Sequence, residues 1–295
     1  MEPTWAGLVD DAAIFPPGNL PLTEAVAAHA DRRDAAHADL VGTLVVRDTD
    51  LPALRETPAR LSVVVTGGAG QIAGPAALGA RLGLRLAGLE IALRDLDDLA
   101  GNARRVVAAV DAARDDGVLD EDLPVYVELP HAGSSAGWLA AADVVAEREL
   151  RLKFRTGGAD PEQVPQPRAL AGWIDAALDR ETPFKCTAGL HHAVRHTGDN
   201  GFGVVSDQHG FLNVLLATRR AFDGAGPDEV SATLDERDGA AVAAAARESD
   251  LAGARRWFTS FGSCSVSDPL DDLIALGLLA DAADGPDGST HEGNS

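Results

Sequence analysis

Lysine is almost absent from this chain. Of its 295 residues, 25 are lysine or arginine, and only Lys153 and Lys185 are lysine. Aromatic residues make up 4% of the chain and cysteine occurs twice, against a hydrophobic content of 45%. Alanine, leucine and valine must therefore build most of the core. Cys186 and Cys264 indicate no disulfide framework and lack the Cys-x-x-Cys spacing of a zinc site.

Positive charge and long apolar runs are also scarce. The net charge is −21 at pH 7, and an acidic surface repels phosphate backbones, which argues against a nucleic-acid partner. No apolar run reaches the length that spans a membrane, and the first residues show no basic-then-apolar signal pattern. We therefore expect a cytoplasmic protein without a membrane or nucleic-acid partner. The composition leaves open whether the chain forms a homo-oligomer.

Short β-rich runs alternate with longer alanine-rich amphipathic segments along the chain. Eight such strands with helices between them predict an α/β fold, a single (β/α)8 TIM barrel covering residues 1–280. A doubly wound open sheet is the alternative, but no Gly-x-Gly-x-x-Gly follows the first strand. The expected strands are 7–14, 40–47, 61–66, 86–93, 124–129, 150–155, 183–187 and 256–262, and the expected helices are 21–35, 69–82, 97–115, 135–148, 167–180 and 210–222.

Two segments fall outside the regular alternation. The link between the seventh and eighth strands, residues 191–255, is unusually long and predicts a mainly helical insertion that forms a lid, a substrate wall or an oligomer contact. Residues 281–295 are rich in Asp, Gly and Ser and predict a disordered acidic tail.

The two lysines lie at the ends of the sixth and seventh expected strands, each before a glycine turn. Arginine cannot replace lysine where an amine must lose its proton and attack a carbonyl. Strand alternation places Lys153 with Arg155, and Lys185 with Thr187, on one face. If that face is the barrel interior, repulsion and desolvation should lower a lysine pKa. The alternative is a structural cluster neutralised by Glu90 and Glu128.

Further polar residues follow the strands at the end where a barrel builds its active site. Glu128 and one of the adjacent histidines, His191 and His192, are expected to transfer protons beside the lysines. An anionic group of a small substrate is expected to meet guanidinium groups, hydroxyls and the backbone N–H groups of glycine turns. The predicted substrate-binding residues are Arg47, Arg155, Thr156, Gly157, Gly158, Thr187, Gly189, Arg195, Ser263 and Ser265.

These residues carry a family resemblance. Lys153-Phe-Arg-Thr-Gly157 resembles the Lys-x-x-Thr-Gly of deoxyribose-phosphate aldolase, in which that lysine forms the Schiff base on strand six. Lys185-Cys-Thr-Ala-Gly189 is similar to that family's strand-seven lysine segment, and Phe261-Gly-Ser-Cys-Ser265 to its strand-eight phosphate-binding segment. The resemblance covers residues 150–266 and implies a class I aldolase without a cofactor. Arg47 stands in place of that family's strand-two cysteine, and Glu90 or Glu128 in place of its aspartate, so we expect a different substrate.

The leading hypothesis is therefore a Schiff-base lyase of the aldolase type that acts on a small carbonyl compound with a phosphate or carboxylate group. A second hypothesis is a metal-dependent hydrolase or isomerase that uses Glu128 with His131, His191 or His192. A third is a barrel that binds a small anion without catalysis.

Overall fold

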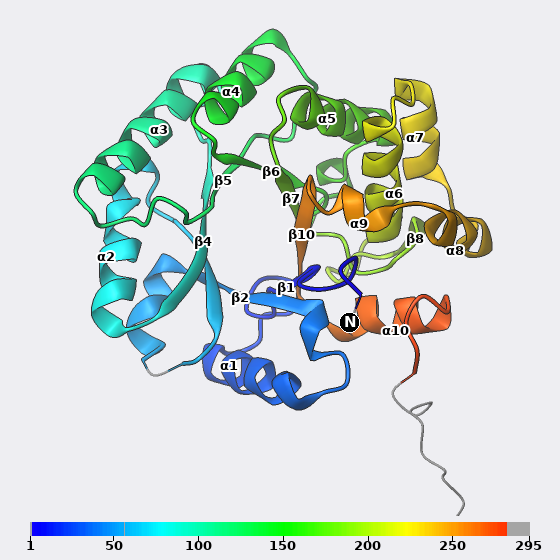
Figure 1. Ribbon diagram of the computed structural model, residues 1–295, viewed down its shortest axis with the longest axis horizontal. Helices are drawn as coiled ribbons and strands as arrows, with labels where there is room; N and C mark the ends of the chain where they lie inside the picture. The colour runs from blue at the N-terminus through cyan, green and yellow to red at the C-terminus, as the bar shows by residue number, and fades with distance from the viewer. Residues whose placement is uncertain (1, 56, 282–295) are drawn as a thin grey trace, which may run out of the picture.

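The fold is an eight-stranded parallel β-barrel with helices between the strands. A computed structural model describes residues 2–55 and 57–281. In these residues the strands close in the order β1-β10-β7-β6-β5-β4-β3-β2, and helices ring the barrel (Figure 1). The predicted (β/α)8 barrel is confirmed. The barrel strands are β1 (Val9–Asp11), β2 (Val41–Arg47), β3 (Arg60–Val64), β4 (Arg85–Ala92), β5 (Val125–Glu128), β6 (Arg151–Arg155), β7 (Phe184–Thr187) and β10 (Phe258–Ser263).

An α-helix follows each barrel strand except β2, after which a 3-10 helix, Asp48–Ala53, leads to β3. Residues 282–295, which hold nearly all of the predicted disordered tail, lie outside the described residues. The helices are α1 (Leu22–Asp31), α2 (Ala73–Leu82), α3 (Leu99–Asp115), α4 (Ala136–Glu147), α5 (Pro167–Asp179), α6 (Phe211–Phe222), α7 (Pro227–Asp235), α8 (Gly239–Glu248), α9 (Leu251–Ala254) and α10 (Ser267–Ala275).

Alternation along the strands separates an apolar outer layer from a charged interior. On β6, Leu152 and Phe154 are buried among apolar residues, while Lys153 between them pairs with carboxylates across the barrel. On β7, Phe184 and Cys186 are likewise in the apolar core, and Lys185 points the other way. The two-residue period of a strand thus places both lysines on the inner face.

Aromatic residues concentrate behind the strands that carry the lysines. The rings of Trp138, Trp173, Phe154, Phe184 and Phe258 form a continuous series, with successive centroids 5.0 to 6.3 Å apart. Trp138 and Trp173 come from α4 and α5, and the three phenylalanines from β6, β7 and β10. Although the chain is poor in aromatic residues, it uses them where large rigid side chains fix β6 and β7 against the helices.

The long segment between β7 and β10 combines an antiparallel hairpin with α6 to α9, which lie beyond β7 and β10 in Figure 1. The hairpin consists of β8 (His196–Asp199) and β9 (Val205–Gln208). We expected helices here but not this hairpin, whose sequence is too polar and glycine-rich to show strand periodicity. Two charged side chains hold it, since Arg195 and Arg237 both pair with Asp207 of β9.

None of the helices among the described residues is both long and apolar enough to cross a membrane.

Candidate active site

Lys153 and Lys185 lie directly opposite each other on neighbouring strands of the barrel. The same register places Glu128 of β5 beside Lys153, and Ser260 of β10 beside Lys185. One layer of the barrel interior is therefore built from a carboxylate, two amines and a hydroxyl. Both lysines are buried, with 4% and 2% of their surface exposed.

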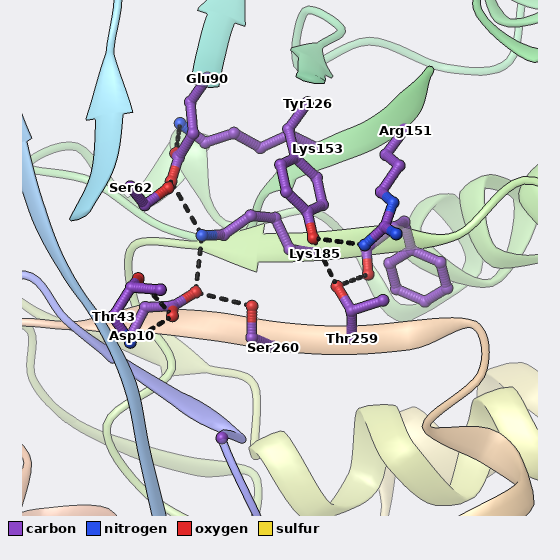
Figure 2. Close-up of polar contacts among 12 residues, drawn as sticks. Asp10, Thr43, Ser62, Glu90, Tyr126, Arg151, Lys153, Lys185, Thr259 and Ser260 are labelled. Carbon is purple, nitrogen blue, oxygen red and sulfur yellow. Dashed lines mark hydrogen bonds and ion pairs between the residues drawn. The ribbon is translucent and has the colours of Figure 1, made fainter. Parts of the chain in front are cut away.

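Glu90 of β4 links the two lysines. Its Oε2 lies 2.7 Å from Nζ of Lys153 and its Oε1 lies 2.8 Å from Nζ of Lys185. Ser62 of β3 donates a further hydrogen bond of 2.5 Å to Glu90 Oε1. Figure 2 shows Lys185 reaching between Glu90 and Asp10, and the amine of Lys153 at the same Glu90 carboxylate. Each lysine therefore shares one carboxylate with the other.

A second carboxylate completes the contacts of each lysine. Nζ of Lys153 lies 2.9 Å from Oε2 of Glu128, and Nζ of Lys185 lies 2.6 Å from Oδ2 of Asp10. Asp10 also accepts hydrogen bonds from Ser260 and Thr43 (Figure 2). The interior thus holds two ammonium groups and three carboxylates in one hydrogen-bonded network.

The expected lowering of the lysine pKa is wrong. Burial favours the neutral amine of Lys153, but the carboxylates of Glu90 and Glu128 outweigh it and raise the pKa above its ordinary value. Burial acts in the same way on Lys185, and Asp10 and Glu90 outweigh it and raise that pKa as well. Carboxylates lie between the amines, so attraction replaces the repulsion that we expected.

The carboxyl groups respond in the opposite direction. Burial alone would raise the pKa of Glu90, but the two ammonium groups reverse this and hold the pKa well below its usual range. The pKa of Glu128 is also lowered, because Lys153 and Arg155 overcome the effect of burial. Glu128 has 13% of its side chain exposed, so this carboxylate joins the buried network to solvent.

The network forms the floor of a cavity of about 480 Å³ at the carboxyl ends of the strands. This is within the usual range for a small-molecule site. Nine of the fifteen predicted site residues line it: Glu128, Lys153, Arg155, Gly157, Gly158, Lys185, Thr187, Gly189 and His191.

Two guanidinium groups add positive charge to this cavity. Nε of Arg155 donates to Oε1 of Glu128 at 2.9 Å, and 39% of the Arg155 side chain remains exposed. Arg94, in the loop after β4, donates to the carbonyl oxygen of Thr66 at 2.6 Å and has no ion pair among the described residues. The lining thus carries four cationic side chains and two carboxylates, in a chain of net charge −21.

The two predicted glycine turns meet in space. A Cβ atom on Gly157 would lie 2.8 Å from the Cα of Gly189, and one on Gly189 would lie 2.9 Å from the Cα of Gly157. Gly189 also has a φ of +76°, which favours glycine. The backbone N–H groups of Gly157, Gly158, Ala188 and Gly189 donate no hydrogen bond to another described residue. Donors for an anion therefore gather on the β6–β7 side of the cavity.

His191 lines the cavity on the side of β10. Its Nδ1 lies 3.3 Å from Oγ of Ser263, and its Nε2 lies 3.8 Å from Sγ of Cys264, which also lines the cavity. Burial lowers the pKa of His191, although Asp268 at 3.8 Å acts in the other direction. The imidazole is therefore neutral at pH 7 and able to accept a proton.

Six predicted site residues do not line the cavity, and each has another contact. Thr156 donates to the carbonyl oxygen of Ala188 and joins the two glycine turns. Ser263 donates to the carbonyl oxygen of Ser265, an arrangement that leaves Cys264 between them facing the cavity. The other three predictions fail for reasons of long-range packing.

Arg47 lies over the ring of Phe15, 4.5 Å from its centroid, so it supports a lining residue from behind. His192 contacts Asp272 of α10 at 3.2 Å and stacks edge-on against His196. Arg195 is 4% exposed and pairs with aspartates at 3.0 and 3.2 Å.

Contacts with Pro165 and Arg195 fix the tautomer of His209. Nε2 of His209 lies 2.7 Å from the carbonyl oxygen of Pro165, so this nitrogen donates and Nδ1 accepts from Arg195 at 3.3 Å. Burial lowers the pKa of His209 to about 4, which keeps the ring neutral. These contacts tie the base of the hairpin to the loop after β6. Arg195 is thus a structural residue rather than the predicted anion ligand.

The predicted metal ligands do not meet. Glu128 and His191 line the main cavity, His131 lies in a separate surface pocket against Trp173, and His192 contacts Asp272. No group of three or more histidine, cysteine or acidic residues in the described part of the chain has a geometry that could hold a metal ion. The metal-dependent hypothesis therefore has no ligand set here.

Several residues of the site were not predicted from the sequence. Asp10 and Asp11 were not among the predicted site residues, but both are buried, and Asp11 pairs with Arg32 at 2.6 Å. Arg94, two residues after the end of β4, was not among the predicted site residues. Asn200 and Phe202 enter the lining from the tip of the hairpin, which no local signal predicted. Glu90 was expected either as a carboxylate that neutralises the lysines with Glu128 or as an alternative to Glu128, and it pairs with both lysines.

Comparison with known proteins adds no relative. No protein-family model matches the chain, and no curated protein matches it.

Proposed function

We propose that this protein is a Schiff-base lyase of the aldolase type that acts on a small anionic carbonyl compound, with Lys153 as the nucleophile. One observation carries the proposal: the chain's two lysines face each other in the floor of a cavity, and a partly exposed carboxylate lies 2.9 Å from one of them. Replacing a buried ion network by apolar residues is often neutral or stabilising. A function that requires an amine explains why these charges are kept.

Lys153 is the better nucleophile of the two lysines. Its partner Glu128 lines the cavity and can pass a proton to a bound substrate. Lys185 is bound instead to Asp10, which has 5% of its side chain exposed and also accepts from Ser260 and Thr43. Lys185 therefore stays protonated, and by sharing Glu90 it weakens the hold of that carboxylate on the proton of Lys153.

The raised pKa of Lys153 defines the first step. The ammonium group gives its proton to Glu128, which leaves a neutral amine and a carboxylic acid. The amine adds to the carbonyl carbon, and the new alkoxide takes the proton from Glu128. The nitrogen then returns a proton to Glu128, which protonates the hydroxyl as it leaves as water, and a C=N bond forms. Glu128 is a carboxylate again at the iminium stage.

Carbon–carbon cleavage follows from the iminium. Glu128 takes the proton of the β-hydroxyl group, the O–H electron pair forms an aldehyde, and the Cα–Cβ electron pair moves into the iminium to give an enamine. Protonation of the enamine carbon by Glu128 and hydrolysis by water release the second product. No redox partner is required, and condensation is the same path in reverse.

The anionic group of the substrate is held by the cationic side of the cavity. In the barrel register, Glu128 pairs with Ala92 on one side and with Lys153 on the other. Arg94 follows Ala92 by two residues and Arg155 follows Lys153 by two, so the two guanidinium groups come from the same level of the barrel. Bidentate guanidinium contacts and the unbonded N–H groups of the glycine turns suit a carboxylate or a phosphate. A reducing cytoplasm suits the unpaired Cys186 and Cys264, and we place the enzyme there.

A barrel that binds a small anion without catalysis is the competing function, because both lysines are charged at rest. Borohydride trapping separates the two. The protein is incubated with aldehydes, 2-oxo acids and phosphorylated aldehydes, reduced with sodium borohydride, and mapped by peptide mass spectrometry. We expect a reduced adduct on Lys153 with at least one anionic carbonyl compound.

Variants of Lys153 sharpen this test. Lys153→Arg and Lys153→Met should give no adduct on peptide 153, while the exposed-site control Arg81→Lys should leave trapping unchanged. Thermal unfolding reports whether each variant folds. Thermal stabilisation by the same compounds without an adduct on either lysine would establish the non-catalytic barrel and overturn the proposal.

A further inference from the structure

The cavity has two chemically different sides. The β4–β7 side carries the lysines, the carboxylates and both guanidinium groups. The opposite side, formed by β1, β2, β3 and their loops, is almost entirely apolar. Its lining residues are Ala12, Phe15, Pro16, Pro17, Val45, Val64, Val65 and Thr66.

The apolar side has almost no free hydrogen-bonding group. Thr66 is its only polar side chain among the lining residues that the structure describes, and both its hydroxyl and its N–H donate to Asp48. Pro16 and Pro17 have no N–H group. The N–H groups of Phe15 and Val65 donate to the carbonyl oxygens of Ala12 and Glu90. A substrate hydroxyl placed here would lose its water and find no donor.

The tip of the β8–β9 hairpin covers the cavity between these two sides. Nδ2 of Asn200 donates to the carbonyl oxygens of Gly158 and Ala159, at 3.2 and 3.1 Å, after β6. Gly201 packs against Pro17 after β1, where a Cβ atom would lie 2.5 Å from Cγ of the proline. Phe202 follows and adds an aromatic ring to the lining. The hairpin thus spans the cavity mouth and extends the apolar surface.

We propose that the substrate is an anionic carbonyl compound that carries, beyond its β-hydroxyl carbon, an unhydroxylated alkyl or aryl arm, which lies against β1–β3 and Phe202. This inference rests on the proposed function for the carbonyl group and on the cavity lining for the arm. The sugar phosphates implied by the family resemblance would place hydroxyl groups on a surface whose Thr66 side chain and whose Phe15 and Val65 N–H groups already donate to protein atoms. A buried methylene group, by contrast, gains about fourfold in affinity there.

A chain-length series of 2-oxo acids tests the inference. Borohydride trapping on Lys153 is measured at sub-saturating concentrations of pyruvate, 2-oxobutanoate, 2-oxopentanoate and 2-oxohexanoate. We expect trapping efficiency to rise at least tenfold from pyruvate to 2-oxohexanoate. A 2-oxo acid of equal length with hydroxyls on carbons 5 and 6, beyond the β-carbon whose hydroxyl the cleavage step uses, should be trapped at least tenfold less than its alkyl counterpart.

One pair of variants locates the arm. Val64→Thr replaces a methyl group by a hydroxyl of the same size in the lining, and should cut the preference for 2-oxohexanoate over pyruvate at least threefold. Val204→Thr is the matched control, since Val204 is on the hairpin but does not line the cavity. It should leave the preference unchanged. Thermal unfolding midpoints confirm that both variants fold.

The outcomes separate the two proposals. Equal trapping of all chain lengths, or efficient trapping of the hydroxylated acid, would overturn the apolar arm while the Schiff base stands. If no probe forms an adduct, the Schiff base fails. Binding of acetate, butanoate and hexanoate, measured by calorimetry, then decides on the arm. Affinity that rises with length and falls in Val64→Thr supports it, and affinity independent of length overturns it.

Discussion

The ammonium groups of Lys153 and Lys185 face each other across the carboxylate of Glu90, at 2.7 and 2.8 Å from its two oxygen atoms. The negative charge between the two amines offsets their mutual repulsion. This arrangement keeps both lysines protonated at rest and makes a proton transfer to a carboxylate the first requirement of any amine chemistry here.

Glu90→Gln tests the bridging carboxylate. The substitution keeps the shape of the side chain but leaves two buried ammonium groups with one fewer negative charge. Breaking a buried pair of this kind costs about 3–5 kcal/mol, so we expect a loss of that order in the free energy of unfolding. Urea denaturation measures it. The exposed Glu248→Gln should change stability by no more than about 0.5 kcal/mol, and equal values for the two variants would contradict the network.

The pH dependence of stability follows from the lowered pKa of Glu128. A carboxyl group whose pKa is lower in the folded state than its ordinary value of 4.5 stabilises the fold above that value. This contribution is lost as the pH falls through the folded pKa. The difference in unfolding free energy between wild type and Glu128→Gln should therefore be constant from about pH 6 to 8 and shrink below about pH 4.5. A difference that grows on acidification would show that the carboxyl group is protonated in the fold.

The anion site is tested with inorganic phosphate as the probe. Phosphate should raise the thermal unfolding midpoint of the wild type, and Arg94→Gln or Arg155→Gln should reduce its apparent affinity about tenfold, the loss of one charge-assisted contact. Arg81→Gln removes the same charge from the exposed face of α2 and serves as the control. If all three substitutions lowered the apparent phosphate affinity equally, the effect would come from the net charge of the protein, and the anion site would be contradicted.

Thiol labelling reports access to the cavity. Cys264 lines the cavity, whereas Cys186 is fully buried behind β7. We expect one thiol to react with iodoacetamide in the folded protein and two after unfolding. Burial raises the pKa of Cys264, so the reaction should be slow at pH 7 and accelerate with pH. A bound carbonyl substrate should protect Cys264, and labelling of Cys186 in the folded state would contradict the packing.

The barrel was readable in the sequence because alternation is a local property. Each lysine has an apolar residue on both sides: Leu152 and Phe154 beside Lys153, and Phe184 and Cys186 beside Lys185. This alternation predicts an inner and an outer face within five residues. The hairpin could not be predicted from the sequence, because β8 and β9 lack an apolar pattern. Ion pairs of Arg195 and Arg237 with Asp207 stabilise it instead.

Residue type and short-range spacing were enough to predict the fold class, the strand-end position of the two lysines and the glycine turns beside them. The charge state of the lysines depends instead on long-range contacts. Glu90 and Asp10 reach Lys185 from 95 and 175 residues away, and the sign of a pKa shift depends on which charge lies nearest in space. The tertiary structure also decided which guanidinium groups face the cavity, because barrel closure brings Arg94 and Arg155 to one side and packs Arg195 against aspartates elsewhere.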